Sequence, residues 1–180
     1  MNVWGFFLKL MGWKVNITVP NRDKVVICVA PHTSNWDFII GLLAYRSKGR
    51  KANFLMKEFW FFFPLKYILT ALGGIPVKQK SSVSLTSVII EDFKTRSKLN
   101  LAVTPEGSRS AVETWRTGFL TIAYQAQVPI QLGVIDFKNK QVTIEKEDFP
   151  KSNYDLDLKE IRKYYSQFKE AARYPEKFIP

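Results

Sequence analysis

The chain has 180 residues, 46% of them hydrophobic and 24% charged, which excludes a disordered polar chain and suits one folded domain. Its formal net charge of +11 indicates an anionic partner, which could be nucleic acid, a membrane surface or a charged substrate. Aromatic residues make up 14% of the chain, which is high for a basic nucleic-acid module and typical of a chain that touches lipid.

Residues 1–14 are the first predicted element, a segment that lies at a membrane interface. Apolar side chains there surround two lysines: Trp4, Phe6, Phe7, Leu8, Leu10, Met11 and Trp13, with Lys9 and Lys14. An ordinary terminal helix packed on the core is the alternative. The stretch has no charged leader and no Ala-x-Ala-type cleavage site, so we expect no cleavable signal sequence.

Strands and helices are expected to alternate along the rest of the chain. Apolar runs predict strands at residues 25–30, 53–56, 75–77, 99–104, 129–137 and 141–144. Apolar residues at helical spacing predict helices at residues 35–46, 58–72, 82–95, 118–127 and 156–173. The sequence therefore predicts a single α/β domain over residues 1–180, with a mostly parallel central sheet flanked by helices on both faces.

Residues 59–77 are apolar enough to be considered as a membrane span, since Lys66 is their only charge. Pro64, the Gly73-Gly74 pair and Pro76 interrupt the stretch, so a short helix, a turn and a strand are expected instead. The aromatic run at residues 60–63 then either dips into lipid or is buried in the core.

Cys28 is the only cysteine, so no disulfide can form within the chain. It lies in the apolar run at residues 25–30, which indicates a packing residue and not a nucleophile. One cysteine and one histidine cannot build the usual Cys/His zinc site. We therefore expect no zinc site of this kind.

His32 is the only histidine and follows a predicted strand, in a loop where proton transfer near neutral pH is feasible. Asp37 can reach it if His32 lies in the loop, Ser34 or Asn35 caps the next helix, and Asp37 lies in the first turn. The carboxylate would then hold the Nδ1 proton and present Nε2 as a base. Alternatively, Asp37 only complements the helix dipole and His32 is inert.

A second polar segment, Glu106-Gly107-Ser108-Arg109, follows the strand predicted at residues 99–104. Arginine binds phosphate oxygens through two hydrogen bonds, and glycine allows close approach of the backbone. Further positive charge would come from Lys57, Lys78, Lys80 and Arg116. Sites in open parallel sheets form beyond the carboxyl ends of strands, so both segments are candidates for one site. A solvated turn with a Glu106–Arg109 contact is the alternative.

Four motifs in order resemble those of the glycerophospholipid acyltransferase family, which includes the lysophosphatidic acid acyltransferases. His32 and Asp37 match its His-x-x-x-x-Asp motif, and residues 105–109 match its Pro-Glu-Gly-Thr-Arg-type motif. The two weaker matches are Lys57-Glu58 leading to residues 73–77, and Val128-Pro129-Ile130. The resemblance covers roughly residues 25 to 135.

The resemblance implies transfer of a fatty acyl group from acyl-coenzyme A or acyl carrier protein to a lysophospholipid hydroxyl. His32 would be the general base and Asp37 would orient it. The acceptor would be bound by Glu106, Gly107, Ser108, Arg109, Lys57 and Lys78. The resemblance implies no metal and no bound cofactor. Such a protein is expected in the cytoplasm, peripheral on the inner face of the cell membrane, with an anionic membrane surface and no nucleic acid as partner.

One position departs from the family. Gln79 stands near the place where the family commonly has a phosphate-binding arginine. Either a neighbouring lysine supplies the charge instead, or the acceptor is not the usual phosphate monoester, and an amino-acid-containing lysolipid is then the alternative acceptor. Two other classes compete. A basic nucleic-acid-binding protein would explain the charge, but no recognition motif is present. A hydrolase on a similar sheet would need a Gly-x-Ser-x-Gly elbow, which the sequence lacks.

Overall fold

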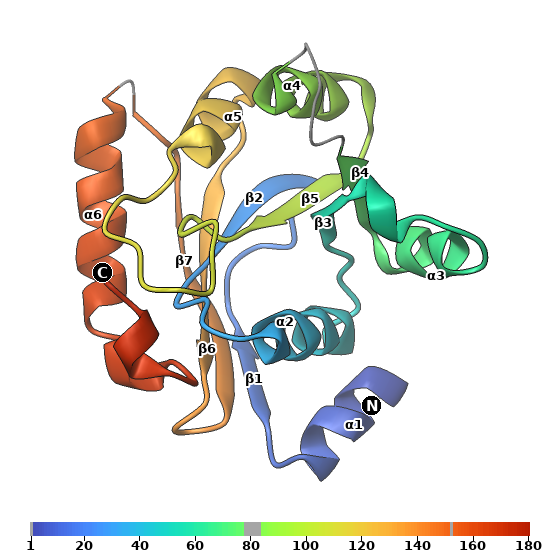
Figure 1. The fold of residues 1–180 in the computed structure, drawn as a ribbon, viewed down its shortest axis with the longest axis vertical. Helices are drawn as coiled ribbons and strands as arrows, with labels where there is room; N and C mark the ends of the chain where they lie inside the picture. Colours follow the sequence, from blue (N-terminus) through green and yellow to red (C-terminus); the bar gives the residue numbers. More distant parts are fainter. Residues whose placement is uncertain (1, 78–83, 152) are drawn as a thin grey trace.

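A seven-stranded sheet forms the centre of the protein in the computed structural model, which describes residues 2–77, 84–151 and 153–180 (Figure 1). The strands are β1 (Lys14–Ile17), β2 (Lys24–Val29), β3 (Asn53–Lys57), β4 (Gly74–Val77), β5 (Leu99–Val103), β6 (Ile130–Asp136) and β7 (Gln141–Asp148). Their order across the sheet is β1-β7-β6-β2-β5-β3-β4. From β6 to β4 all neighbours are parallel, and only β7 runs antiparallel to its neighbour β6.

Helices cover both faces of this sheet. They are α1 (Val3–Leu10), α2 (Asn35–Ser47), α3 (Leu65–Leu72), α4 (Leu85–Thr95), α5 (Gly118–Ala126) and α6 (Tyr154–Ser166). Buried residues of α4, α5 and α6 pack on one face, and those of α1 and α2 pack on the other (Figure 1). The predicted fold class, a single α/β domain with a mostly parallel sheet between helical layers, is confirmed.

The central strand β2 shows why its sequence is apolar throughout. Val26 and Cys28 point into the large core beneath α4, α5 and α6, while Val25 and Ile27 point into a smaller core with Tyr45 of α2. Successive side chains of a strand face opposite sides of the sheet, so a strand covered on both faces needs hydrophobic residues at every position.

The apolar stretch after β3 is broken as Pro64 and the glycines predicted. A short 3-10 turn, Glu58–Trp60, precedes α3, and α3 ends at Gly73, which adopts a left-handed conformation with φ of 103°. The expectation of a mostly helical segment from residue 58 to 72 is therefore wrong for residues 61–64. Proline lacks the N–H that would continue a helix through this point. Within the described ranges, no helix is both long and apolar enough to cross a membrane.

Three larger differences from the prediction concern β1, β7 and α6. β1 was not expected, and β7 extends to Asp148, beyond the predicted end at residue 144. The helix predicted to residue 173 ends at Ser166, because the chain turns back there to bury Ala172 and Phe178 in the core. The predicted start of the α4 helix at residues 82–83 lies outside the described residues.

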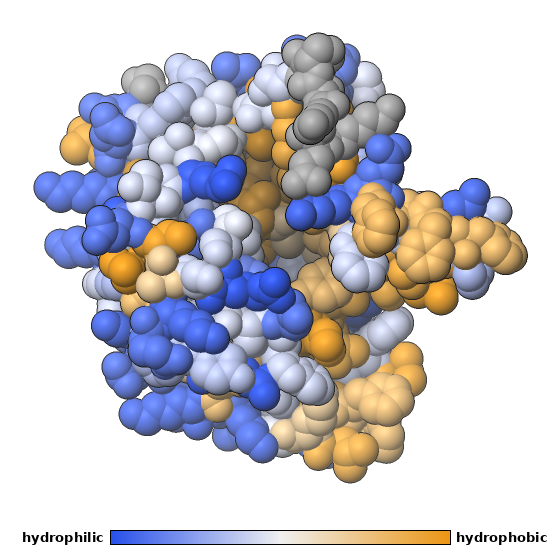
Figure 2. All heavy atoms as spheres, in the orientation of Figure 1, coloured by the Kyte–Doolittle hydropathy of each residue, from blue (hydrophilic) through white to orange (hydrophobic). Residues whose placement is uncertain are grey.

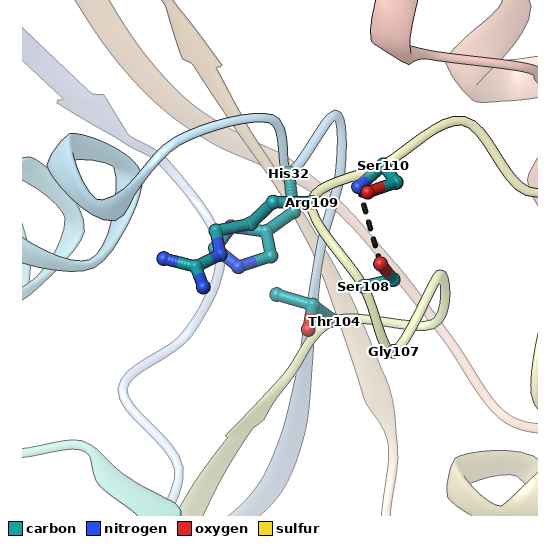
Figure 3. A pocket seen from close by; sticks show the side chains of 6 residues that line it. All are labelled: His32, Thr104, Gly107, Ser108, Arg109 and Ser110. Carbon is teal, nitrogen blue, oxygen red and sulfur yellow. Dashed lines mark hydrogen bonds between the residues drawn. The ribbon is translucent and has the colours of Figure 1, made fainter.

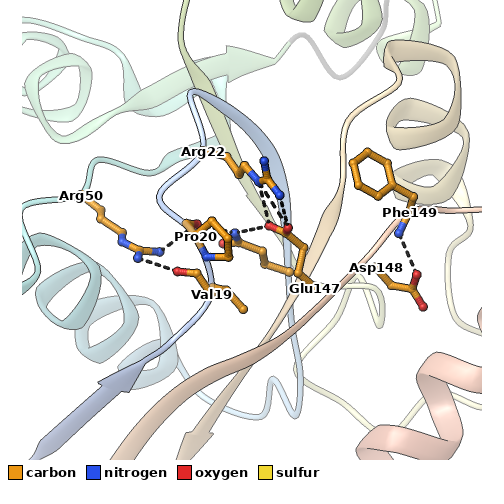
Figure 4. Close-up of polar contacts among 8 residues, drawn as sticks. Val19, Pro20, Arg22, Arg50, Glu147, Asp148 and Phe149 are labelled. Carbon is orange, nitrogen blue, oxygen red and sulfur yellow. Dashed lines mark hydrogen bonds and ion pairs between the residues drawn. The ribbon is translucent and has the colours of Figure 1, made fainter.

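A polar network joins the segment before β2 to the end of β7 (Figure 4). Arg22 Nη2 lies 2.7 Å from Glu147 Oε1, and the fully buried Gln131 donates to Glu147 Oε2 over 2.7 Å. Arg50 donates to the backbone oxygen of Val19 over 2.7 Å. These contacts lie at the amino end of β2, opposite the edge that carries the candidate site.

Candidate active site

The two polar segments meet because their strands are neighbours. His32 follows β2, Glu106 follows β5, and Cys28 pairs with Val103 in the parallel ladder between these strands. Both loops therefore leave the sheet at the same edge and at the same level. This is the carboxyl edge, where open parallel sheets form their sites.

His32 and Asp37 lie close together, as the sequence spacing requires if only Asp37 is helical. Nδ1 of His32 is 3.0 Å from Oδ2 of Asp37, although the two atoms do not meet hydrogen-bond geometry. Such pairs are often poorly aligned without substrate and straighten when it binds.

Asp37 holds the loop that carries His32. Its Oδ2 accepts hydrogen bonds of 2.8 Å from the backbone N–H groups of Thr33 and Ser34, and its Oδ1 accepts one from the Ser34 hydroxyl. Ser34 is the N-cap of α2, one of the two caps considered from the sequence. The side chain of Asp37 is buried, and among the described residues its hydrogen-bond and ion-pair partners are these groups and the imidazole.

Glu106 lies behind His32 and not at the surface of the site. Its two carboxylate oxygens are 3.1 and 2.9 Å from the backbone nitrogen of His32, which donates to them, and the residue is only 5% exposed. Burial raises the pKa of Glu106 to about 8, against the lowering effect of the His32 N–H and with a further rise from Asp37. The Glu106–Arg109 contact that was considered as the alternative does not occur among the hydrogen bonds and ion pairs of these two described residues.

A cavity of about 310 Å3 opens beside the imidazole (Figure 3). This volume is within the range of small-molecule sites. Its walls are His32, Thr104, Gly107, Ser108, Arg109 and Ser110. The Arg109 guanidinium is exposed at the cavity and donates to the side-chain oxygen of Asn35. The cavity thus combines one imidazole, one guanidinium and several hydroxyl groups, a set suited to an anionic, hydroxyl-bearing ligand.

Gly107 is required by the shape of the turn between β5 and Arg109. Its φ is +63°, a conformation that side chains rarely adopt, and its N–H donates to Thr104 O over 3.0 Å. A Cβ at this position would collide with Nε of Arg116 and lie 2.7 Å from its Cδ. Arg116 therefore packs directly on the glycine that lines the cavity.

Of the two lysines expected to bind the acceptor, Lys57 does not line the cavity. Lys57 is exposed at the carboxyl end of β3, the strand next to β5. Lys78 lies outside the described residues.

Several residues of the site were not expected from the sequence. Thr104 and Ser110 line the cavity, and Thr33 Oγ1 accepts a 3.2 Å hydrogen bond from the backbone N–H of Tyr174. Thr104 is the first residue after β5, so its place at the strand end was the available signal. The Thr33–Tyr174 contact joins residues 141 positions apart and has no local signal.

In the part of the chain that the structure describes, no three His, Cys, Asp or Glu side chains are grouped so that they could hold a metal ion. Cys28 is completely buried and lies away from the cavity wall, as expected for a packing residue.

These features define an α/β enzyme with a histidine–aspartate pair beside a basic, polar cavity at the carboxyl edge of its sheet. Residues 14–134 match the family described as Acyltransferase, and the matched range contains both polar segments. The chain belongs to the acyltransferase family. No curated protein matches the sequence.

Proposed function

We propose that the protein transfers a fatty acyl group from acyl-coenzyme A or acyl carrier protein to the hydroxyl of a lysophospholipid such as 1-acyl-glycerol-3-phosphate. The observation that carries this proposal is the 3.0 Å contact between His32 and Asp37 at the wall of a cavity that also presents Arg109. An imidazole oriented by a carboxylate activates a hydroxyl, and a guanidinium binds phosphate.

His32 acts as the general base in the proposed reaction. With Nδ1 facing Asp37, Nε2 takes the proton of the acceptor hydroxyl while its oxygen attacks the thioester carbonyl carbon. The tetrahedral intermediate then expels the thiolate, and the imidazolium returns its proton to the departing sulfur. Asp37 stabilises the imidazolium between these steps. No enzyme nucleophile is required, because the acceptor supplies the attacking oxygen.

A row of partly exposed apolar side chains supports the proposal of a fatty acyl ligand. Leu55, Ile75 and Val103 lie on adjacent strands β3, β4 and β5, where Leu55 pairs with Ile75 and Val103 is the last residue of β5. Val103 directly precedes Thr104, which lines the cavity with His32. Figure 2 shows a hollow bordered by hydrophobic residues between α3 and the α4–α5 side of the molecule. An acyl chain placed along this row would bring its thioester to the imidazole.

Two exposed apolar surfaces support a membrane as partner. Phe6, Phe7 and Leu10 project from α1, and Phe59 and Phe63 lie before α3 with 79% and 77% of their surface exposed. Figure 2 shows these regions as hydrophobic areas on the same side of the molecule. Monomeric proteins rarely expose such patches without a binding partner.

The charges around these surfaces favour an anionic membrane. Glu58 is the only acidic residue in α1, the 3-10 turn and α3, whereas Lys9 and Lys66 are basic. We therefore propose that the protein is peripheral on the inner face of the cell membrane, where anionic lipids are found. The acceptor and product of the reaction would remain in that membrane.

Mass spectrometry of reaction products tests the reaction. The wild-type protein is incubated with a mixture of lysophospholipids and either thioester donor, beside His32→Ala. We expect a diacyl product whose formation falls by at least about 100-fold in His32→Ala. A product from an amino-acid-containing lysolipid alone would favour the alternative acceptor. Free fatty acid without transfer, or full turnover in His32→Ala, would contradict the proposal.

Co-sedimentation with vesicles tests the membrane partner. Vesicles of phosphatidylcholine with and without phosphatidylglycerol are compared with duplex DNA at the same salt concentration. We expect binding to the anionic vesicles that weakens when Phe6 and Phe7, or Phe59 and Phe63, are replaced by serine. Phe149→Ser is the matched control, since Phe149 is an exposed phenylalanine after β7, outside both apolar surfaces. Equal loss in this control, or binding to DNA alone, would contradict a membrane surface.

A further inference from the structure

Three successive backbone N–H groups of the catalytic loop are bound by two carboxylates. His32 N–H donates to Glu106, and the N–H groups of Thr33 and Ser34 donate to Asp37. Both acidic residues are buried. The main chain that carries the imidazole is therefore fixed from two sides by side chains that come from different segments of the chain.

The side chain of Glu106 points in a different direction from the three residues that follow it. Gly107, Ser108 and Arg109 line the cavity, whereas Glu106 does not, and both of its oxygens are directed to the His32 nitrogen. A ligand in the cavity would meet the turn after Glu106 and not the carboxylate itself. A buried carboxylate costs stability unless its hydrogen bonds are made, so its position behind His32 is a specific one.

We propose that Glu106 is a positioning residue, which fixes the main chain of His32 through its N–H group, and that it does not bind the acceptor. This inference rests on the proposed function, in which His32 is the general base. Its physical basis is the sensitivity of general-base catalysis to placement, because a displacement of about 1 Å can reduce turnover by about 100-fold.

Two substitutions separate positioning from a charge-based role. Glu106→Gln keeps the length of the side chain and an oxygen that can accept from His32 N–H, but it cannot become a carboxylate. Glu106→Asp can still ionise and is one methylene shorter, so its oxygens do not reach the same nitrogen without movement of the loop. Positioning predicts that the glutamine variant is the more active of the two, whereas a charge contact with substrate predicts the opposite order.

Steady-state kinetics with the lysophospholipid acceptor measures this order. We expect kcat to fall less than about tenfold in Glu106→Gln and about 100-fold in Glu106→Asp and Glu106→Ala, with the acceptor KM within about threefold of wild type in all of them. Arg109→Ala is the comparison, since we expect it to raise the acceptor KM. A higher acceptor KM in both Glu106→Gln and Glu106→Ala, with kcat unchanged, would overturn the proposal.

The single histidine provides a second measurement that needs no turnover. The chain contains one His, so the imidazole Cε1–H gives one NMR signal, and backbone exchange can be followed at the His32 amide. We expect Glu106→Gln to keep the wild-type signal and slow exchange. Glu106→Asp and Glu106→Ala should shift or broaden the signal and speed exchange of the His32 amide. Their circular dichroism spectra should remain those of a folded protein.

These readouts also separate the two proposals from each other. If the wild-type protein acylates no lysolipid but the NMR order is found, the proposed reaction is wrong and the positioning of His32 by Glu106 stands. An unchanged His32 signal and unchanged amide protection in folded Glu106→Asp would overturn the positioning role even if transfer is observed. Should Glu106→Ala not fold, the comparison of glutamine with aspartate decides alone.

Discussion

Oδ2 of Asp37 lies 3.0 Å from Nδ1 of His32 and accepts 2.8 Å hydrogen bonds from the backbone of Thr33 and Ser34 at the same time. One oxygen thus contacts the imidazole and also fixes the two residues that follow it. The position of the ring and the conformation of the loop are therefore set by the same buried atom. Removing this carboxylate should affect both.

Asp37→Asn tests this double role. The amide cannot stabilise an imidazolium, and its NH2 group cannot accept the N–H groups of the loop, so we expect kcat to fall by about 100-fold or more. Loss of these hydrogen bonds in a buried site should also lower the free energy of unfolding by about 1–3 kcal/mol. Kinetics and urea unfolding measure the two effects. Asp23→Asn is the control, because Asp23 is exposed and forms an ion pair with the exposed Lys98. Turnover close to wild type in Asp37→Asn would leave this residue with a capping role only.

Arg109→Ala should mainly impair acceptor binding. The guanidinium is exposed at the cavity wall, so its loss removes a phosphate contact and little packing. We expect the acceptor KM to rise about tenfold or more, while the KM for the thioester donor changes little. Arg109→Lys should recover part of this loss, because lysine keeps the charge without the paired hydrogen bonds. A change in the donor KM alone would indicate that Arg109 binds the thioester donor and not the acceptor.

Gly107→Ala and Gly49→Ala form a matched pair. Both glycines have positive φ, 63° and 71°, so alanine should cost each about 1 kcal/mol of backbone strain. Only Gly107 has a side chain in the way, that of Arg116, whereas nothing lies within 4 Å of a Cβ at Gly49. We expect the free energy of unfolding of Gly107→Ala to be lower than that of Gly49→Ala by about 1 kcal/mol, and acyl transfer by Gly107→Ala to be reduced. Equal urea midpoints would show that Arg116 moves aside freely.

Cys28 should not react with thiol reagents while the protein is folded. The residue is completely buried, and burial raises the pKa of its thiol, so neither access nor thiolate is available. Labelling with iodoacetamide, read by mass spectrometry, should appear only after denaturation, and Cys28→Ala should retain transfer. Native labelling at the rate of the unfolded chain would contradict the packing role.

Glu106 should make stability depend on pH. Burial raises its pKa from 4.5 to about 8, so between these values the folded state holds a proton that the unfolded state has released. This contribution is fully present below about pH 4.5 and is lost as the pH rises through about 8. Thermal unfolding at about pH 5 and about pH 9 should therefore show a smaller difference in Tm for Glu106→Gln than for wild type. An equal Tm difference in wild type and Glu106→Gln would show that a group other than Glu106 causes the pH dependence.

Local sequence signals were sufficient to predict the fold class and the proximity of the two polar loops. The apolar run of β2, the cap at Ser34 and the proline after β5 each determine structure within a few residues. β1 gave no such signal, because it has four residues, Lys14–Ile17, that alternate between exposed and partly buried on an edge of the sheet. Its pairing with β7 depends on residues far along the chain.

The candidate site was predictable in its residues but not in the direction of their side chains. Glu106 and Arg109 belong to one motif, yet the turn at Gly107 directs the first to the His32 backbone and leaves the second at the cavity. The end of α6 likewise depends on the burial of Phe178, which no local pattern encodes. Contacts between distant segments decide both cases.

The pairing of β1 with β7 has a consequence for how the molecule is built. Lys14 pairs with Gln141, so β1 has no partner in the sheet until β7 has been synthesised. Pairings between such distant segments form slowly. We therefore expect this edge of the sheet to close after the pairing of β2 with β5, the two strands that bring His32 and Glu106 together.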